Sequence, residues 1–427
     1  KVRPLKGTSR FATLDAGNNN YNSAFGAEAL TNNNADNNAA FGYRALKGNT
    51  TAVDNSAFGT NALKSCTTGS YNSAFGKDSM AATTTGDQNC AFGDRSLDSN
   101  TNGRRNCAFG ILALQANTTG SQNTALGRLA LYGNTTADNN VAVGTLALYT
   151  NETVSGLTAV GYQALRLNTT GTMNVAVGYN ALYANTTGFE NTAVGYQALE
   201  DCTTGDRNTA MGSIALRDVT TGSLNAGFGR EALRDLTTGS YNTACGRSAG
   251  EQMTTGSNNC LLGNDAGRAG NPGGTVSSQS NRICLGNNQI TNFSCQVSLT
   301  ATSDKRDKAD ITDFTPGLSW INKLRPVTYK WDQRSWYGTD EDPFGIPDGS
   351  KKASKINIGL LAQEELEVEK EHGYGNDEDD MLIADISSDG NQYSMKYERL
   401  VPVLVNAVKE LSAENTALKA RLDAAGL

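Results

Sequence analysis

The chain reads Asn55-Ser56-Ala57-Phe58-Gly59, and 17 residues later it reads Asn72-Ser73-Ala74-Phe75-Gly76. The shared pattern is Asn-x-Ala-(Phe/Val/Leu)-Gly, and it returns at this fixed interval as far as Asn259. In one step Leu157 holds the place of the asparagine. Earlier copies begin at Asn22 and Asn38, and the pattern decays at Asn259 and Asn281. A strict period of this length predicts a stacked solenoid or roll.

Each repeat carries two further signals. An Ala-Leu pair such as Ala62-Leu63 follows the glycine, and a Thr-Thr-Gly turn such as Thr67-Thr68-Gly69 comes next. A unit of this size is too short for a helical hairpin, and it fits two short strands joined by two turns. The glycines supply turn positions with positive φ, while Asn and Thr side chains can form ladders between coils. Roughly sixteen coils stacked at ~4.8 Å would form a rod about 75 Å long.

The strand pattern indicates which side chains point inward. In Thr192-Ala193-Val194 the alanine faces one way and its two neighbours face the other. The alanine row is small enough to fill a narrow coil, so the Phe/Val/Leu row needs a second buried surface. We therefore expect identical chains to pack side by side as a homotrimer. The alternative is a monomeric solenoid with an apolar stripe.

Composition excludes several functional classes. The net charge is -7, which argues against nucleic acid as the main partner, because phosphate binding needs a basic face. No apolar run reaches the ~18 residues that span a membrane, so no membrane insertion is expected. The chain has 8 cysteines without a CxxC pair and 1 histidine, so no zinc site and no cofactor are expected. Cys90 and Cys107 occupy one site in adjacent coils, and we interpret them as small apolar fillers rather than a disulfide.

Other motifs in the chain have simpler explanations. Asn117, Asn168 and Asn185 match glycosylation acceptors, but the repeat itself generates these triplets. The threonine rows raise the alternative of ice binding, which the glycines and varied charges around them disfavour. The acidic run 377–380 lacks the alternating spacing of a calcium loop and is interpreted as a solvated loop.

The composition changes near Thr302, where the repeats stop and the three tryptophans begin. Residues 318–324 have helical spacing, with an expected buried face at Leu318, Ile321 and Leu324. Residues 325–331 alternate as a strand, with Val327, Tyr329 and Trp331 on one side, and residues 357–364 run from a strand into a helix. These segments predict a small α+β domain.

A long helix is predicted from Tyr397 to the end of the chain. Its apolar heptad positions are Leu404, Val408, Leu411, Leu418 and Leu422. Asn415 occupies one position of the same seam, where a polar residue can fix register and strand number. We interpret this helix as a coiled-coil oligomerisation tail.

The segment Ser303-Asp304-Lys305-Arg306-Asp307-Lys308-Ala309-Asp310-Ile311 lies where the repeats give way to this domain. A catalytic triad would have to use the single histidine, His372, whereas a Ser-Lys pair needs none. Such a pair requires a lysine amine that gives up its proton near neutral pH, which burial favours. Ser303 and Lys308 have a spacing that allows this chemistry. The alternative is a solvated charge cluster in a linker.

Two resemblances add to this interpretation. The repeat array resembles the β-roll heads of trimeric autotransporter adhesins and repeat fibres of phage tails. Residues 302–420 present four motifs in order: Ser-Asp-x-Arg-x-Lys-x-Asp-Ile, Leu-x-x-Ile-x-x-Leu-x-Pro-Val-x-Tyr-x-Trp, Ile-Gly-Leu-Leu-Ala-Gln-Glu and Tyr-x-x-Leu-Val-Pro-Val-Leu-Val. This order is similar to the intramolecular chaperone, a self-cleaving peptidase domain, of phage endosialidases, tail fibres and neck appendages. The myelin regulatory factor family carries the same module.

The resemblance implies a trimeric chaperone that templates folding of the preceding fibre and then cuts itself free once. It implies Ser303 as nucleophile, Lys308 as general base, and Asp304 beside the scissile bond, with the cut on either side of Ser303. It also implies that Arg306 and Asp310 hold the local geometry by ion pairs. The chain departs from the family at Gln363-Glu364-Glu365-Leu366, where the family more often has one acidic residue and an apolar one.

These observations predict a mainly β fibre or spike at a virion surface or outside the cell, with a host-surface glycan or protein as receptor. The alternatives are a cell-surface trimeric adhesin and a polysaccharide-degrading tailspike. The expected division has a lead-in at 1–17, a shaft at 18–300, the chaperone and peptidase domain at 301–396, and the coiled-coil helix at 397–427.

Overall fold

The computed structural model describes residues 11–12, 21–271, 274–290, 293–294, 296, 303–339, 342–387 and 390–426. The chain forms two compact units, and each is described by itself. The first unit contains Lys1–Ala266 and Ser277–Leu285, and the second contains Gly267–Val276 and Gly286–Leu427. The four segments expected from the sequence have different boundaries from these two units, and that division stays a prediction.

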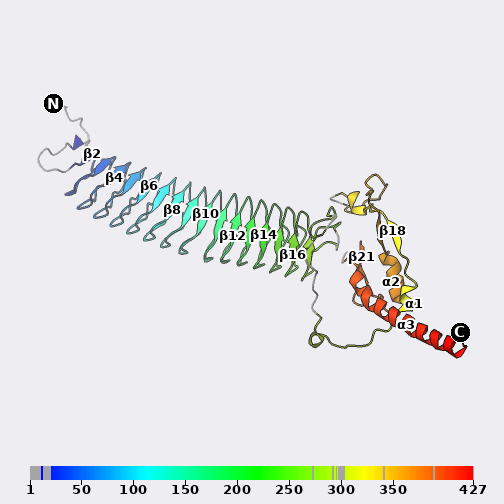
Figure 1. The fold of residues 1–427 in the computed structure, drawn as a ribbon. Helices are drawn as coiled ribbons and strands as arrows, with labels where there is room; N and C mark the ends of the chain where they lie inside the picture. Colours follow the sequence, from blue (N-terminus) through cyan, green and yellow to red (C-terminus); the bar gives the residue numbers. More distant parts are fainter. Residues whose placement is uncertain are drawn as a thin grey trace. The chain divides into compact units, whose positions relative to one another are not determined.

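The first unit is a parallel β-solenoid of about 14 turns, seen as a row of stacked arrows in Figure 1. Each of its strands from β2 onward has three residues and pairs in parallel with the next. Only β1 runs antiparallel, against β2. The strands are β1 (Phe11–Ala12), β2 (Ser23–Phe25), β3 (Ala39–Phe41), β4 (Ser56–Phe58), β5 (Ser73–Phe75), β6 (Cys90–Phe92), β7 (Cys107–Phe109), β8 (Thr124–Leu126), β9 (Val141–Val143), β10 (Thr158–Val160), β11 (Val175–Val177), β12 (Thr192–Val194), β13 (Thr209–Met211), β14 (Ala226–Phe228), β15 (Thr243–Cys245), β16 (Cys260–Leu262) and β17 (Ile283–Leu285).

The solenoid has one strand per coil, so the expectation of two strands was wrong. The Ala-Leu segment turns instead of extending, because residues such as Asn61 (φ 59°) and Leu63 (φ 52°) adopt the left-handed conformation. That conformation costs a residue with a side chain roughly 1–2 kcal/mol. The turning backbone still bonds between coils, since Leu63 N–H donates to Ser79 O at 3.1 Å. The stack of coils therefore compensates for the local strain.

The alternation expected for the strands is confirmed. Ala57, Ala62 and Leu63 are fully buried inside their coil. Phe58 lies on the outward side of β4 and is half-buried. In this unit the small alanine row fills the interior, and the larger apolar row is left at the surface.

Two asparagine ladders run through the interior of the solenoid. In the first, Asn55 Oδ1 accepts from Asn72 N–H at 2.9 Å, and Asn72 Nδ2 donates to Gly86 O at 2.9 Å. In the second, Asn117 Nδ2 donates to Asn100 Oδ1 at 2.9 Å. All of these asparagines are buried, so they satisfy polar backbone groups that water does not reach. The burial of Asn117 also rules out its use as a glycosylation acceptor in the folded chain.

Glycine at the ends of strands β2 to β15 is required by the close approach of the next coil. Gly76 has φ 136°, and a Cβ placed on it would lie 2.4 Å from Gly93 O. No side chain fits at that distance. The Thr-Thr-Gly segment forms its own ladder, in which Thr67 Oγ1 donates to Thr84 O at 3.1 Å.

Aromatic side chains of successive coils stack on one another, both in the outward row of the strands and at the position just after the strand-end glycine. Phenylalanine rings of five successive coils stack with centroids 4.4–4.8 Å apart, and three tyrosines stack at 5.2–5.3 Å. The stacks comprise Phe41, Phe58, Phe75, Phe92 and Phe109, and then Tyr162, Tyr179 and Tyr196. Aromatic stacking of this kind holds successive coils in register.

The described cysteines are all free thiols. Cys90 and Cys107 are register partners in adjacent strands and remain thiols. Cys66 and Cys202 are fully buried at the position that Asn100 and Asn117 hold in other coils, and Cys66 Sγ lies 3.2 Å from Gly69 O. Burial raises the pKa of the Cys66 thiol to about 11.

The second unit combines short helices with two small antiparallel sheets, β18 with β19 and β20 with β21 (Figure 1). Its core consists of Trp320, Val368, Ile383, Leu400 and Val403. The elements are η1 (Lys305–Asp307), α1 (Leu318–Ile321), β18 (Val327–Tyr329), η2 (Arg334–Trp336), β19 (Asn357–Gly359), α2 (Ala362–Glu371), β20 (Ala384–Ile386), β21 (Tyr393–Met395), η3 (Tyr397–Arg399) and α3 (Leu400–Ala424).

The face expected to be buried at residues 318–324 is borne out in part. Ile321 and Leu324 are half-buried and pack against the core, and Leu318 is half-buried. Trp320, which was not expected in that face, is fully buried. Trp320 is buried because its indole finds a hydrogen-bond partner inside the domain, at Glu365 Oε1. Apolar spacing alone does not reveal that partner.

The C-terminal helix is confirmed. η3 leads directly into α3, giving 28 residues of continuous helix. Its first half packs on the domain through Leu400, Val403 and Ala407, which are buried. The expected heptad positions form a stripe beside that buried face, and all of them are exposed in the single chain, including Leu411 at 52%; Val401 is exposed as well, at 57%. The helix therefore has one occupied face and one free apolar face.

Candidate functional site

The segment around Ser303 folds into one tight turn. Asp304 caps the short helix η1 by accepting from Arg306 N–H at 2.9 Å, and Lys308 follows the last residue of the turn. The turn brings the two ends of the segment together, so Lys308 Nζ lies 2.7 Å from Ser303 Oγ. A local motif of six residues thus places a hydroxyl and an amine at hydrogen-bond distance.

Arg306 holds the cap in place. Its guanidinium contacts both oxygens of Asp304, with Nε at 3.1 Å from each and Nη2 at 2.5 Å from Oδ2. The side-chain bonds from Arg306, and then its backbone N–H, hold the pKa of the Asp304 carboxyl below its usual value. Both side chains face solvent, so the pair orients the turn more than it stabilises the fold.

Asp310 does not form the ion pair expected of it. Among the described residues it has no ion-pair partner, and its backbone adopts the left-handed conformation with φ 49°. Aspartate is one of the few residues that tolerate this conformation. Its place in the structure is therefore that of a turn residue.

The environment of the pair also differs from the expected one. Ser303 and Lys308 are both exposed, so within a single chain nothing buries the lysine amine. Residues 309–313 are exposed as well. Thr302, on the other side of Ser303, lies outside the described residues. The described residues position the nucleophile and the amine, and none of them forms a water-excluding wall around the pair.

A cluster of buried polar groups lies between α1, α2 and β20. Glu369 is fully buried, and its carboxylate accepts from Leu382 N–H at 2.8 Å and Ile383 N–H at 2.7 Å. Glu365 accepts from Trp320 Nε1 at 2.8 Å. Burial raises the pKa of Glu365, the bond from Trp320 opposes this, and the Glu369 charge adds to it. The first of the paired residues Glu364-Glu365 instead binds Arg325 at the surface, so the departure from the family pattern places one carboxyl outside and one inside.

A contact between Ser319 and His372 was missed by the sequence analysis. His372 Nε2 lies 3.2 Å from Ser319 Oγ, and its Nδ1 lies 2.8 Å from Val368 O. A catalytic triad places a carboxylate at Nδ1, whereas here a backbone carbonyl occupies that position. The ring also stacks on Trp320 with centroids 4.7 Å apart, so this histidine serves the packing of the domain.

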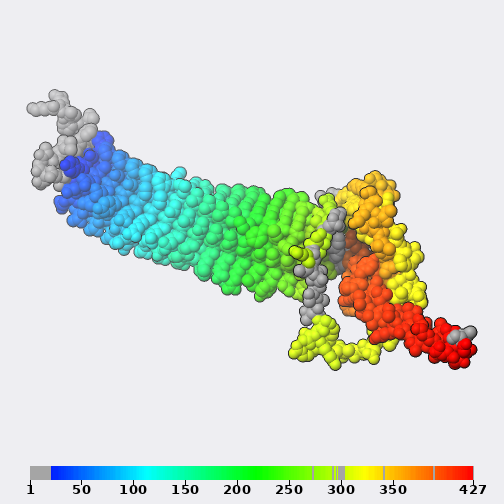
Figure 2. Space-filling model, viewed as in Figure 1, coloured from blue at the N-terminus to red at the C-terminus, as the bar shows by residue number. Residues whose placement is uncertain are grey.

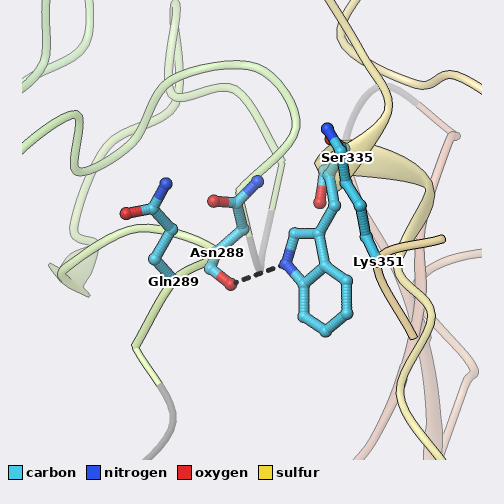
Figure 3. A pocket seen from close by; sticks show the side chains of 5 residues that line it. Asn288, Gln289, Ser335 and Lys351 are labelled. Carbon is cyan, nitrogen blue, oxygen red and sulfur yellow. Dashed lines mark hydrogen bonds between the residues drawn. The ribbon is translucent and has the colours of Figure 1, made fainter. Parts of the chain in front are cut away.

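A polar pocket of about 360 Å³ opens within the second unit. Figure 3 shows Asn288 and Gln289 on one side of it and Ser335 and Lys351 on the other. Trp336 Nε1 donates to Asn288 O at 3.4 Å across the pocket, and the Lys351 amine donates to Trp336 O. Ser335 Oγ is buried and has no hydrogen-bond partner among the described residues. The lysine is engaged with the backbone, so the pocket does not repeat the Ser303–Lys308 arrangement.

Across the described ranges, no group of three or more His, Cys, Asp or Glu side chains is placed to hold a metal ion. Of the helices in the described part of the chain, none combines the length and apolarity needed to cross a bilayer.

Comparisons with known proteins bear on the C-terminal part alone. No curated protein and no solved structure matches the chain significantly. Residues 303–374 match the family model described as "Chaperone of endosialidase". The match begins at the Ser303 turn and extends through α1, β18, β19 and α2, and it ends before α3. The chain thus carries a chaperone-of-endosialidase segment near its C-terminus, preceded by a β-solenoid of 17-residue repeats.

Proposed function

We propose that this protein is a trimeric fibre or spike of a virion, whose C-terminal domain templates folding of the shaft and then cuts itself free. The observation that carries the proposal is the 2.7 Å contact between Lys308 Nζ and Ser303 Oγ, at the first residues of the chaperone-of-endosialidase match. The solenoid before it has the architecture of an attachment shaft. A host-surface glycan or protein is the partner that such a shaft would contact.

The proposed reaction uses the serine hydroxyl and the lysine amine. Neutral Lys308 Nζ takes the hydroxyl proton as Ser303 Oγ adds to a neighbouring peptide carbonyl. The C–N bond then breaks as the lysine returns that proton to the departing amine, leaving an ester. Water hydrolyses the ester and restores the serine hydroxyl. The domain cuts once, so it is an enzyme only in the single-turnover sense.

Ring geometry favours one side for the cut. Attack of Ser303 Oγ on the Thr302 carbonyl closes a five-membered ring, whereas attack on its own carbonyl closes a strained four-membered ring. Orientation of the reacting atoms decides rates by many orders of magnitude. We therefore place the cut between Thr302 and Ser303, with Ser303 as the new N-terminus.

The trimer is supported by two apolar surfaces that a single chain leaves exposed. On α3 they are the heptad positions, with Val408 at 64% and Leu418 at 53%. On the solenoid they are the outward side chains, such as Phe41 at 38% and Met211 at 46%. Polar Asn415 lies in the α3 stripe, where it can specify register and strand number. Packing of copies against the C-terminal unit would also supply the burial that Lys308 lacks.

The C-terminal domain benefits folding by fixing which repeats of the three chains lie side by side. Three chains that pair through identical coils can slip by whole repeats, because each repeat offers the same contacts as its neighbour. A C-terminal trimer aligns the C-terminal ends of the three solenoids before their coils form one after another. Cutting afterwards removes the template, so the finished shaft is trapped kinetically.

The test is the intact mass of freshly expressed protein beside Ser303→Ala, Lys308→Ala and the control Ser319→Ala. We expect wild type and Ser319→Ala to split into about 300 and about 125 residues, with the smaller fragment starting at Ser303, while the other two variants stay whole. A smaller fragment starting at Asp304 would place the cut on the other side. A whole wild-type chain would overturn the peptidase assignment, and loss of cutting in Ser319→Ala would move it to the Ser319–His372 pair.

A further inference from the structure

Helix α3 contacts the chain just downstream of the Ser303–Lys308 turn. Asn406 Nδ2 donates to Phe314 O at 2.6 Å and to Pro316 O at 3.3 Å. One turn further along the helix, Glu410 Oε2 accepts from Leu318 N–H at 2.8 Å. The two side chains are half-buried, and each reaches about ninety residues back along the sequence.

These contacts fix residues 314–318 to α3, and we call this set of hydrogen bonds the joint. Gly317 precedes α1 and offers no side chain to cap it, so Glu410 provides the acceptor that the first helical N–H needs. Gly317 is itself buried, and a Cβ placed on it would lie 2.7 Å from Ala407 N. The backbone at this point therefore lies directly against α3. No other residue type fits there without moving the helix.

The joint is where the chain after the Ser303–Lys308 turn becomes fixed to the domain. Residues 309–313 are exposed, and Phe314 is the next side chain that packs on the core, with its ring 5.9 Å from Trp320. About five residues of exposed chain separate Lys308 from this anchor. The position of α3 therefore limits where the turn can lie.

On α3, Asn406 and Glu410 lie next to the buried Val403 and Ala407, on the flank away from the heptad stripe. That stripe carries the exposed Leu404 and Val408. When copies pack on that stripe, the helix that receives them is the helix that holds residues 314–318.

We infer that Asn406 and Glu410 are positioning residues for self-cleavage, which make the reaction depend on α3 being correctly seated. The inference rests on the proposed self-cleavage of the Ser303–Lys308 site. It adds that the rate is controlled through hydrogen bonds made far from the reacting atoms. Neither residue touches the serine or the lysine.

The test compares cleavage rates of the full chain carrying Glu410→Ala, Glu410→Gln or Asn406→Asp, with Glu414→Ala as an exposed control on the same helix. Glutamine keeps an acceptor for Leu318 N–H and alanine does not. We expect Glu410→Ala and Asn406→Asp to cut about tenfold to a hundredfold more slowly than wild type, and Glu410→Gln to cut at close to the wild-type rate. Light scattering should give all variants the wild-type oligomeric mass.

A second measurement is independent of cutting. In a Ser303→Ala background, hydrogen exchange of the Leu318 amide should be faster with Glu410→Ala than with Glu410→Gln. Wild-type cleavage in Glu410→Ala, or equal losses in alanine and glutamine variants, would overturn the positioning role. A wild-type chain that never cuts would refute the proposed function instead, and the exchange experiment would then report on the joint alone.

Discussion

Replacing Asn106 with alanine tests whether the buried asparagine ladder stabilises the solenoid. Asn106 is 1% exposed, and its side chain joins three consecutive coils. Its Oδ1 accepts from Asn123 N–H at 3.0 Å, and its Nδ2 donates to Gly120 O at 2.8 Å. In the variant, the buried Asn123 N–H has no acceptor, while Gly120 O keeps the bond from Asn117 at 3.0 Å.

The cost follows from that difference. A buried donor left without a partner costs about 1–3 kcal/mol, and losing the bond to an acceptor that stays paired costs about 1 kcal/mol. The local stability of the coil should therefore fall by about 2–4 kcal/mol. At 1.4 kcal/mol for each factor of ten, exchange of the Asn123 amide should be faster by a factor of roughly 30 to 1000.

Hydrogen exchange followed by mass spectrometry reads this out in the peptide that contains Asn123. Thr119→Ala is the matched control, because Thr119 is exposed in the coil that the ladder crosses. We expect the control to leave protection unchanged. If Asn106→Ala changes protection less than about threefold, the ladder contributes little and apolar packing alone holds the coils.

Four further predictions concern other parts of the chain. Gly76→Ala should lower the free energy of unfolding by about 2 kcal/mol or more, because of its φ of 136° and the 2.4 Å approach to Gly93 O; denaturant titration measures this, and an unchanged midpoint would contradict it. Leu411→Asp should abolish the proposed trimer in light scattering while the exposed control Ser412→Asp keeps it, since a charge in the apolar stripe opposes packing; a trimeric Leu411→Asp would exclude α3 from the proposed interface. The stability of Glu365→Gln relative to wild type should increase as pH rises from about 4 to 7. Burial raises the pKa of Glu365, so its carboxyl does not destabilise wild type while it is protonated in both the folded and the unfolded chain, and it does so once the unfolded chain ionises. Thermal melts across this pH range measure the difference, and a constant difference would refute the argument. Cys66 and Cys202 should resist alkylation until denaturant is added, since burial raises the pKa of their thiols to about 11 and about 12; rapid native labelling in a mass spectrum would contradict their burial.

The solenoid was predictable because the same sequence pattern recurs in coil after coil. The interval between Asn55 and Asn72 fixes the coil, and the alternation in Thr192-Ala193-Val194 fixes which side is inside. The number of strands per coil was not predictable, since left-handed residues such as Leu63 are stabilised by contacts with the next coil rather than by their own preference. Local propensity has no access to such contacts.

For the candidate site, too, one part was predictable from the sequence and another part was not. The turn that joins Ser303 to Lys308 is local, and its spacing was visible in the sequence. The exposure of Lys308 depends on what packs around the segment, which spacing does not encode. Likewise the Trp320–Glu365 bond joins residues 45 positions apart, and apolar periodicity marked Trp320 no differently from its neighbours.

The coils of the shaft are interchangeable, and this has a consequence for how such proteins change over generations. Each coil offers hydrogen-bond acceptors to one neighbouring coil and matching donors to the other. If a whole repeat is added or deleted, the two coils that then meet can still form the same hydrogen bonds. The coil between Cys260 and Ile283 is longer than the others, yet the two residues still pair in register. Extra length within a coil is therefore compatible with continued pairing of the strands on either side of it. Gene duplication within the array would lengthen the solenoid in fixed increments of one coil, without refolding its ends.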